Sequence, residues 1–269
     1  MKYMYVSIAA MIIVFGTGYL LARLIVKKSS GTHKGAKTAG FTVLIGCALL
    51  VIISLLYFGD CSRAGERART ALLGSESVTV SEIDGGYLFD GPSSSKAIVF
   101  YPGAKVECEA YAPLMLKLAE TDFDCFLADM PFNFAMFGGD AAEKFTDRYS
   151  YDTWLMAGHS MGGIMAANYA EKNPDRLNGI ILLAAYSTTK LDDSFQLCSI
   201  YGSEDRELEQ DVYNNNKGNW PKDSFELVIE GGNHAQFGDY GVQKSDGTAT
   251  ISAEEQQRIT AEAISQYFQ

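Results

Sequence analysis

Three side chains of this sequence have the types and the chain order of a nucleophile, an acid and a base. A serine stands at the centre of Gly158-His159-Ser160-Met161-Gly162, directly after an apolar run. An acidic residue follows in Gly202-Ser203-Glu204-Asp205, and a histidine comes last in Gly231-Gly232-Asn233-His234. A serine hydroxyl becomes a strong nucleophile when a histidine takes its proton and a carboxylate orients that histidine. The pattern therefore predicts acyl-transfer chemistry at Ser160.

The glycines around Ser160 allow two interpretations. Gly158 and Gly162 flank it at positions −2 and +2, as a sharp strand-to-helix turn requires. Such a turn exposes the serine oxygen above a helix N-terminus, whose dipole favours developing negative charge. A glycine-rich helix start with Ser160 as its cap would use the same residues. The motif alone leaves both interpretations open.

The scarcity of histidines favours the catalytic interpretation. The chain has three histidines, His33, His159 and His234. His33 belongs to a basic stretch near the N-terminus, and His159 adjoins Ser160, where neighbouring side chains diverge. His234 follows the last expected strand, where the order serine, acid, histidine places the base. We therefore predict His234 as the base.

The acid is predicted to be Asp205, with Glu204 as its competitor. Asp205 stands three residues past Gly202, in the loop after its strand, where it would orient His234 and stabilise the imidazolium. Its alternative role is that of a helix N-cap, because aspartate is common there.

The oxyanion hole is predicted to use the backbone N–H of Met161, the residue after the nucleophile. A second N–H is expected from the loop after "IVFY". Ala104 is the first choice there and Lys105 the second.

Alternating strands and helices are expected to position these residues. After Gly74 the sequence predicts a β-hairpin, then six further strands with helices among them, and a last helix with a capping box at Ser252 and Glu255. Such alternation predicts a mostly parallel sheet with helices on both faces, and the side chains that follow the strands meet at one edge of it. The expected strands are 77–83, 85–91, 96–101, 123–128, 153–158, 177–187, 195–202 and 225–230; the expected helices are 111–120, 160–173 and 252–268, and 211–221 is expected to be a polar loop.

Two apolar stretches precede this region. Residues 4–22 and 38–59 carry no charged side chain, and the first run continues to residue 26 past Arg23. Each is long enough to cross a hydrocarbon core of about 30 Å as a helix. The sequence therefore predicts a transmembrane hairpin over 1–60 with helices at about 4–26 and 38–59, a linker over 61–74 and a catalytic domain over 75–269. A cleaved signal peptide is the alternative for the first run.

The basic residues predict the orientation of this hairpin. Five lysines and arginines lie between the two runs, at Arg23, Lys27, Lys28, Lys34 and Lys37. Cytoplasmic loops carry such an excess, so the domain after residue 60 is expected outside the cytoplasm. Three arginines that follow the second run weigh against this orientation.

Composition excludes several functions. The chain has 269 residues and a net charge of −11, which argues against non-specific nucleic-acid binding. Its five cysteines show no C-x-x-C spacing, so no zinc site is signalled. We expect neither a metal nor an organic cofactor.

The three motifs together resemble the α/β-hydrolase superfamily over about residues 75–269. More narrowly, residues 101–114, 129–137 and 231–241 look like a compact bacterial branch with many membrane-anchored members. The resemblance implies a Ser160-Asp205-His234 triad and an acyl-enzyme mechanism. Two features depart from the family's pattern: Pro102-Gly103 replaces the usual His-Gly, and only about 45 residues separate Ser160 from Asp205, too few for a helical lid.

The substrate is expected to be a small acyl compound, since this fold hosts many activities. The apolar side chains of Phe132, Phe134 and Phe137 are expected either to line an open cleft or to belong to the core. Acyl transfer to an acceptor other than water is an alternative activity for the same triad. A binding protein that has kept the fold without catalysis is a second alternative. The oligomeric state is left open by the sequence.

Overall fold

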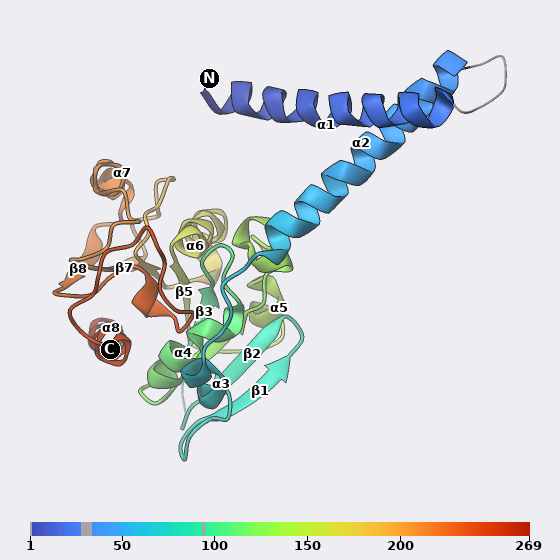
Figure 1. Ribbon diagram of the computed structural model, residues 1–269. Helices are drawn as coiled ribbons and strands as arrows, with labels where there is room; N and C mark the ends of the chain where they lie inside the picture. Colours follow the sequence, from blue (N-terminus) through green and yellow to red (C-terminus); the bar gives the residue numbers. More distant parts are fainter. Residues whose placement is uncertain (1, 28–33, 93–94) are drawn as a thin grey trace. The chain divides into compact units, whose positions relative to one another are not determined.

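The computed structural model describes residues 2–27, 34–92 and 95–269 (Figure 1). Residues 28–33, with Lys28 and His33 of the expected basic loop, lie outside the described residues. The chain forms two compact units, residues 1–60 and 61–269.

The first unit consists of two long helices, α1 (Lys2–Lys27) and α2 (Lys34–Gly59). Among the described residues, one helix is long and apolar enough to cross a membrane, over Lys34–Ser54 with a mean hydropathy of 2.1. Only 6% of its most apolar stretch is buried, which is unlike the core helix of a water-soluble domain. The backbones of α1 and α2 approach closely at Gly18, where a Cβ atom would lie 3.1 Å from the Thr42 carbonyl oxygen.

The second unit is built on an eight-stranded sheet in the order β1-β2-β4-β3-β5-β6-β7-β8. The pairs β1–β2 and β2–β4 are antiparallel. The remaining pairs, which join β3 to β8, are parallel. The expected mostly parallel sheet is therefore confirmed. The strands are β1 (Thr79–Ile83), β2 (Gly86–Asp90), β3 (Lys96–Tyr101), β4 (Asp124–Ala128), β5 (Thr153–His159), β6 (Gly179–Leu183), β7 (Gln196–Gly202) and β8 (Asp223–Ile229).

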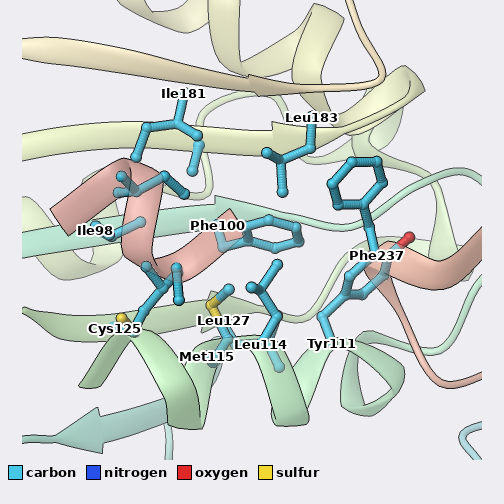
Figure 2. Packing of buried hydrophobic residues seen from close by; sticks show 14 of the residues in the cluster. Ile98, Phe100, Tyr111, Leu114, Met115, Cys125, Leu127, Ile181, Leu183 and Phe237 are labelled. Carbon is cyan, nitrogen blue, oxygen red and sulfur yellow. The ribbon is translucent and has the colours of Figure 1, made fainter. Parts of the chain in front are cut away.

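Helices cover both faces of the sheet because its central strands are apolar on both sides. One cluster joins Phe100, Leu183 and their neighbours to α3 (Glu66–Ala71), α4 (Ala112–Ala119) and α8 (Ala253–Tyr267). Figure 2 shows this cluster, with Phe100 between Leu183 and Leu114. The other cluster joins the opposite sides of the same strands to α6 (Met161–Lys172). The short helices α5 (Glu143–Thr146) and α7 (Gln210–Asn216) complete the unit.

Two segments differ from their expected structure. Residues 211–221 were predicted as a polar loop, and this is wrong: α7 covers most of the segment because Tyr213 is completely buried. Its hydroxyl lies 2.8 Å from the Ser199 Oγ and donates to Glu226. Residues 61–74, expected as a linker, contain α3, whose Ala68 is completely buried.

The expected capping box of α8 forms only in part, and the expected absence of a lid agrees with the structure. The Ser252 hydroxyl accepts from the Glu255 N–H and caps α8, although the Glu255 carboxylate bonds Arg258 and does not complete a capping box. Residues 161–204 are all described, and they contain α6, a 3₁₀ turn, β6 and β7 but no lid helix.

Candidate active site

Ser160 occupies a sharp turn between β5 and α6. Its φ is +53° and its ψ is −126°, a conformation that costs a residue with a side chain of order 1–3 kcal/mol. Its hydroxyl makes no capping hydrogen bond to α6, which argues against the helix-cap interpretation. The turn is held by the Ser160 N–H, which donates to the Leu183 carbonyl at 2.9 Å. We call residues 158–162 the Ser160 elbow.

The elbow glycines are required by close backbone contacts. A Cβ on Gly158 would lie 2.5 Å from the Gly162 backbone, and a Cβ on Gly162 would lie 2.2 Å from the Tyr101 carbonyl oxygen. A Cβ on Gly163 would lie 2.4 Å from the Ala185 Cβ. Larger side chains would therefore collide with the backbone or with Ala185 at these three positions, which is why a turn of this type requires glycine there.

His234 and Asp205 form a buried pair. The His234 Nδ1 lies 2.9 Å from the Asp205 Oδ2, and the two residues are 4% and 8% exposed. The Asp205 Oδ1 accepts the backbone N–H groups of Glu207 and Leu208 at 2.9 and 2.8 Å. Asp205, not Glu204, is thus the carboxylate that contacts His234. Its other oxygen accepts the two backbone N–H groups that follow it, which is the kind of contact that the alternative N-cap role predicts.

Side chains that the sequence did not point to hold the His234 loop, residues 231–240. Gln256 on α8 is completely buried, and its amide accepts from the Asn233 N–H at 3.0 Å and donates to the Asn233 carbonyl at 2.8 Å. Asp246 accepts from the N–H groups of Ala235 and Arg206, so it links this loop to the one that carries Asp205. In the sequence, the one sign of this role was that Gln256 is a polar residue on the face of α8 that is buried.

The loop after β3, residues 102–107, is the expected oxyanion loop. The Lys105 N–H donates to the Asn133 carbonyl at 2.8 Å and is therefore occupied. Among the described residues, the Ala104 N–H has no hydrogen-bond partner. Met161 is the first residue of α6, where helix geometry leaves the N–H unpaired. The geometry thus favours Ala104 over Lys105 as the second donor.

His159 is buried beside the His234 ring, with ring centroids 4.5 Å apart. Burial and the neighbouring His234 hold the pKa of His159 well below its usual value, so it is neutral. Its Nδ1 lies 2.8 Å from the Tyr111 hydroxyl, and its Nε2 is buried without a hydrogen-bond partner among the described residues. His159 is thus engaged elsewhere and is no rival to His234 as a base.

The segment 61–68 contacts both the oxyanion loop and the His234 loop. The Ser62 N–H donates to the Lys105 carbonyl at 2.7 Å, and the Ser62 carbonyl accepts from the Glu107 N–H at 3.0 Å. The Glu107 carboxylate accepts from Arg63 and from the Ala64 N–H, which hold its pKa below the usual value against the effect of burial. Farther along, the Gly65 N–H donates to the Asp239 carbonyl at 2.7 Å.

The phenylalanines after β4 have different surroundings. Phe134 is 8% exposed, whereas Phe132 and Phe137 are 59% and 51% exposed. Phe132 and Phe137 line a cavity of about 740 Å³, formed mainly by residues 129–141 with Gly85 and Lys144. Its lining includes none of Ser160, Asp205 and His234. The two exposed rings therefore line a hollow whose walls do not include the three predicted triad residues.

No metal site is formed within the described residues, where no three His, Cys, Asp or Glu side chains come together. The five cysteines are free thiols.

Comparison with known proteins gives a family match. A model of the alpha/beta hydrolase family matches residues 97–258, which span β3 to α8 and include the elbow, Asp205 and His234. No curated protein matches the chain significantly.

Solved structures with the same fold include several named esterases. A predicted CIB-like hydrolase from Thermoplasma acidophilum is 16% identical, with a TM-score of 0.54, covering 71% of this chain and 99% of that one. Naproxen esterase from Bacillus subtilis is 11% identical, with a TM-score of 0.55 and coverage of 75% and 95%. Carboxyl esterase 2 from Tuber melanosporum is 12% identical, with a TM-score of 0.53 and coverage of 77% and 90%. At these identities the likeness establishes the fold alone.

Proposed function

Because the chain belongs to the alpha/beta hydrolase family, we propose that it is a membrane-anchored serine hydrolase that cleaves an ester or related acyl compound. The observation that carries this proposal is the buried His234–Asp205 pair at 2.9 Å, in the same unit as the strained Ser160 elbow. A strained serine without a capping bond is costly in a structural role and useful in a reactive one.

The proposed reaction has two halves. The Ser160 Oγ attacks the acyl carbon as its proton passes to the His234 Nε2, and the N–H groups of Ala104 and Met161 stabilise the negative oxygen. The intermediate collapses, the alcohol leaves with the proton from His234, and the acyl group stays on Ser160. Water then attacks this acyl-enzyme with His234 again as base, which releases the acid and restores Ser160. Asp205 keeps the Nδ1–H of His234 in place throughout.

The substrate is proposed to be a small acyl compound. The named esterases among the structural neighbours support this class, and the absence of a lid helix over residues 161–204 favours an open site. No part of the proposed reaction requires a cofactor.

The membrane anchor is proposed to be a two-helix hairpin of α1 and α2. Both helices expose large apolar side chains, such as Leu24 at 63% and Leu44 at 65%, which lipid would cover. Their close approach at Gly18 is of the kind that small residues permit between membrane helices. The basic residues between the helices favour a hydrolase unit outside the cytoplasm.

A fluorophosphonate probe tests the proposed nucleophile. The full chain in detergent is expected to be labelled and to hydrolyse short p-nitrophenyl esters, and Ser160→Ala should abolish both. The exposed Ser75 provides a matched control, since Ser75→Ala should change neither. Folded wild-type protein without labelling or turnover would refute the proposal and revive the binding-protein alternative. Product analysis with added alcohols would reveal acyl transfer as the main activity instead.

A reporter tests the proposed topology. Alkaline phosphatase fused after residue 269 is active only outside the cytoplasm, so we expect activity from this fusion. A fluorescent-protein fusion at the same position should stay dark after export. The opposite pair of results would overturn the orientation and leave the hydrolase assignment untouched.

A further inference from the structure

A buried tyrosine lies between the two backbone segments that would form the oxyanion hole. The Gly103 N–H donates to the Tyr111 hydroxyl oxygen at 3.1 Å, and the same oxygen lies 2.8 Å from the His159 Nδ1. Gly103 immediately precedes Ala104, and His159 lies two residues before Met161. One hydroxyl group thus joins the oxyanion loop to the Ser160 elbow.

We propose that Tyr111 is a positioning residue whose hydroxyl sets the distance between the N–H groups of Ala104 and Met161. The inference rests on the proposed function, because it assigns a role in the same reaction. It adds a residue to the site that the three motifs do not contain.

The direction of the hydrogen bonds follows from the donors present. A backbone N–H can only donate, so the Tyr111 oxygen accepts from Gly103 and its own proton is available for His159. Burial and the neighbouring His234 hold the pKa of His159 well below its usual value, so the ring is neutral and its Nδ1 shares one hydrogen bond with the Tyr111 hydroxyl. The relay runs from the Gly103 N–H through Tyr111 to His159.

Packing fixes the position of the Tyr111 ring. Tyr111 is completely buried, and its ring centroid lies 5.0 Å from that of Phe100. Figure 2 shows the ring beside Leu114 and Phe237, with its oxygen at the edge of the cluster. A Cβ on Gly103 would lie 2.8 Å from the hydroxyl oxygen and 3.0 Å from the His159 Nδ1, so only glycine permits this arrangement.

Tyr111→Phe tests the role because it removes the hydroxyl and keeps the ring. Loss of one oxyanion donor typically lowers kcat about 100- to 1,000-fold, and displacing a donor costs less. We expect kcat for a short p-nitrophenyl ester to fall about 10- to 100-fold, with KM within about twofold of the wild-type value. The rate of fluorophosphonate labelling should fall by a similar factor, because phosphonylation also places charge on that oxygen.

Tyr213→Phe is the matched control. Tyr213 is also completely buried, and its hydroxyl bonds Ser199 and Glu226, which belong to neither the elbow nor the oxyanion loop. It should lose stability without a change in kcat of the folded enzyme. Equal falls in kcat for both variants, or a kcat for Tyr111→Phe within about threefold of wild type, would overturn the inference.

His159→Gln examines the other end of the relay and decides the matter if Tyr111→Phe does not fold. It should lower kcat without changing KM, and the double variant should fall no further than the lower single variant. Full activity of His159→Gln, or additive losses in the double variant, would contradict the relay. Ser160→Ala separates the two proposals: if it is inactive while Tyr111→Phe equals wild type, the inference alone fails.

Discussion

Replacing Asp205 with asparagine should remove the base without removing the fold. In Asp205→Asn one side-chain oxygen becomes an NH₂ group. The Oδ1 of Asp205 accepts two backbone N–H groups, from Glu207 and Leu208, whereas the Oδ2 faces the His234 Nδ1. The amide will therefore keep its oxygen on the two N–H donors and direct its NH₂ toward His234. The Nδ1 must then accept a hydrogen bond, which moves the His234 proton to Nε2, the nitrogen that has to act as base.

The size of the effect can be bracketed from these contacts. With the wrong tautomer fully populated, a triad of this type loses about ten-thousandfold in kcat, or about 5.4 kcal/mol. Flipping the amide would restore the tautomer but would set its NH₂ against two N–H groups, at a cost of about 2 kcal/mol for two lost hydrogen bonds. About one molecule in 30 would then be active. The expected fall in kcat therefore lies between about 30-fold and ten-thousandfold.

The assay is steady-state hydrolysis of a short p-nitrophenyl ester by the full chain in detergent. KM should stay close to the wild-type value, because Asp205 acts through His234 and not on the substrate. Asp124→Asn is the matched control: Asp124 is 5% exposed and accepts from the Gly91 N–H and the Tyr151 hydroxyl, away from His234. A folded Asp205→Asn protein that loses less than tenfold in kcat would refute the tautomer argument.

Three further changes probe the frame of the site. Gly162→Ala would place a Cβ within 2.2 and 2.3 Å of two backbone oxygens, so the free energy of unfolding should fall by about 2–3 kcal/mol. As its control, Gly218→Ala meets nothing within 4 Å and should leave the melting temperature unchanged. His159 has a lowered pKa when folded, so the unfolded chain binds more protons below about pH 6.5. Stability is therefore full above that pH and falls as the pH drops below it, a loss that denaturation of His159→Gln, followed by tryptophan fluorescence, should not show. Glu107→Gln leaves one carboxylate oxygen fewer for Arg63 and the Ala64 N–H, and should lower the free energy of unfolding by about 1–2 kcal/mol; a change below about 0.3 kcal/mol would count against this contact.

The mostly parallel sheet was predictable because local signals and tertiary structure agree. Apolar runs such as 96–101 and 196–202 are buried on both faces, so continuous hydrophobicity identified them as central strands. The segment 211–221 misled for the opposite reason. Three asparagines there are typical of a loop, and the burial of Tyr213, which anchors α7, depends on contacts with β7 and β8 that no local pattern reveals.

The proposed reactive residues were visible in the sequence, and their supports were not. Ser160 and His234 lie close to glycines that are typical of tight turns. The order serine, acid, histidine along the chain then indicated which residue would be the acid and which the base. Tyr111 and Gln256 carry no such mark, because tyrosines and glutamines are common and their partners lie 48 and 23 residues away along the chain. Positioning groups of this kind are defined by distance in space, which one sequence does not encode locally.

The segment 61–68 belongs to the frame of the site as much as Tyr111 does. Ser62 pairs with both Lys105 and Glu107 in the oxyanion loop, and the N–H groups of Gly65 and Ala68 donate to Asp239 in the His234 loop. The loops that would supply an oxyanion donor and the base are therefore held by the same eight residues. Only Asp60 separates this segment from the end of α2 at Gly59. Displacing residues 62–65 would therefore break backbone hydrogen bonds to both the oxyanion loop and the His234 loop.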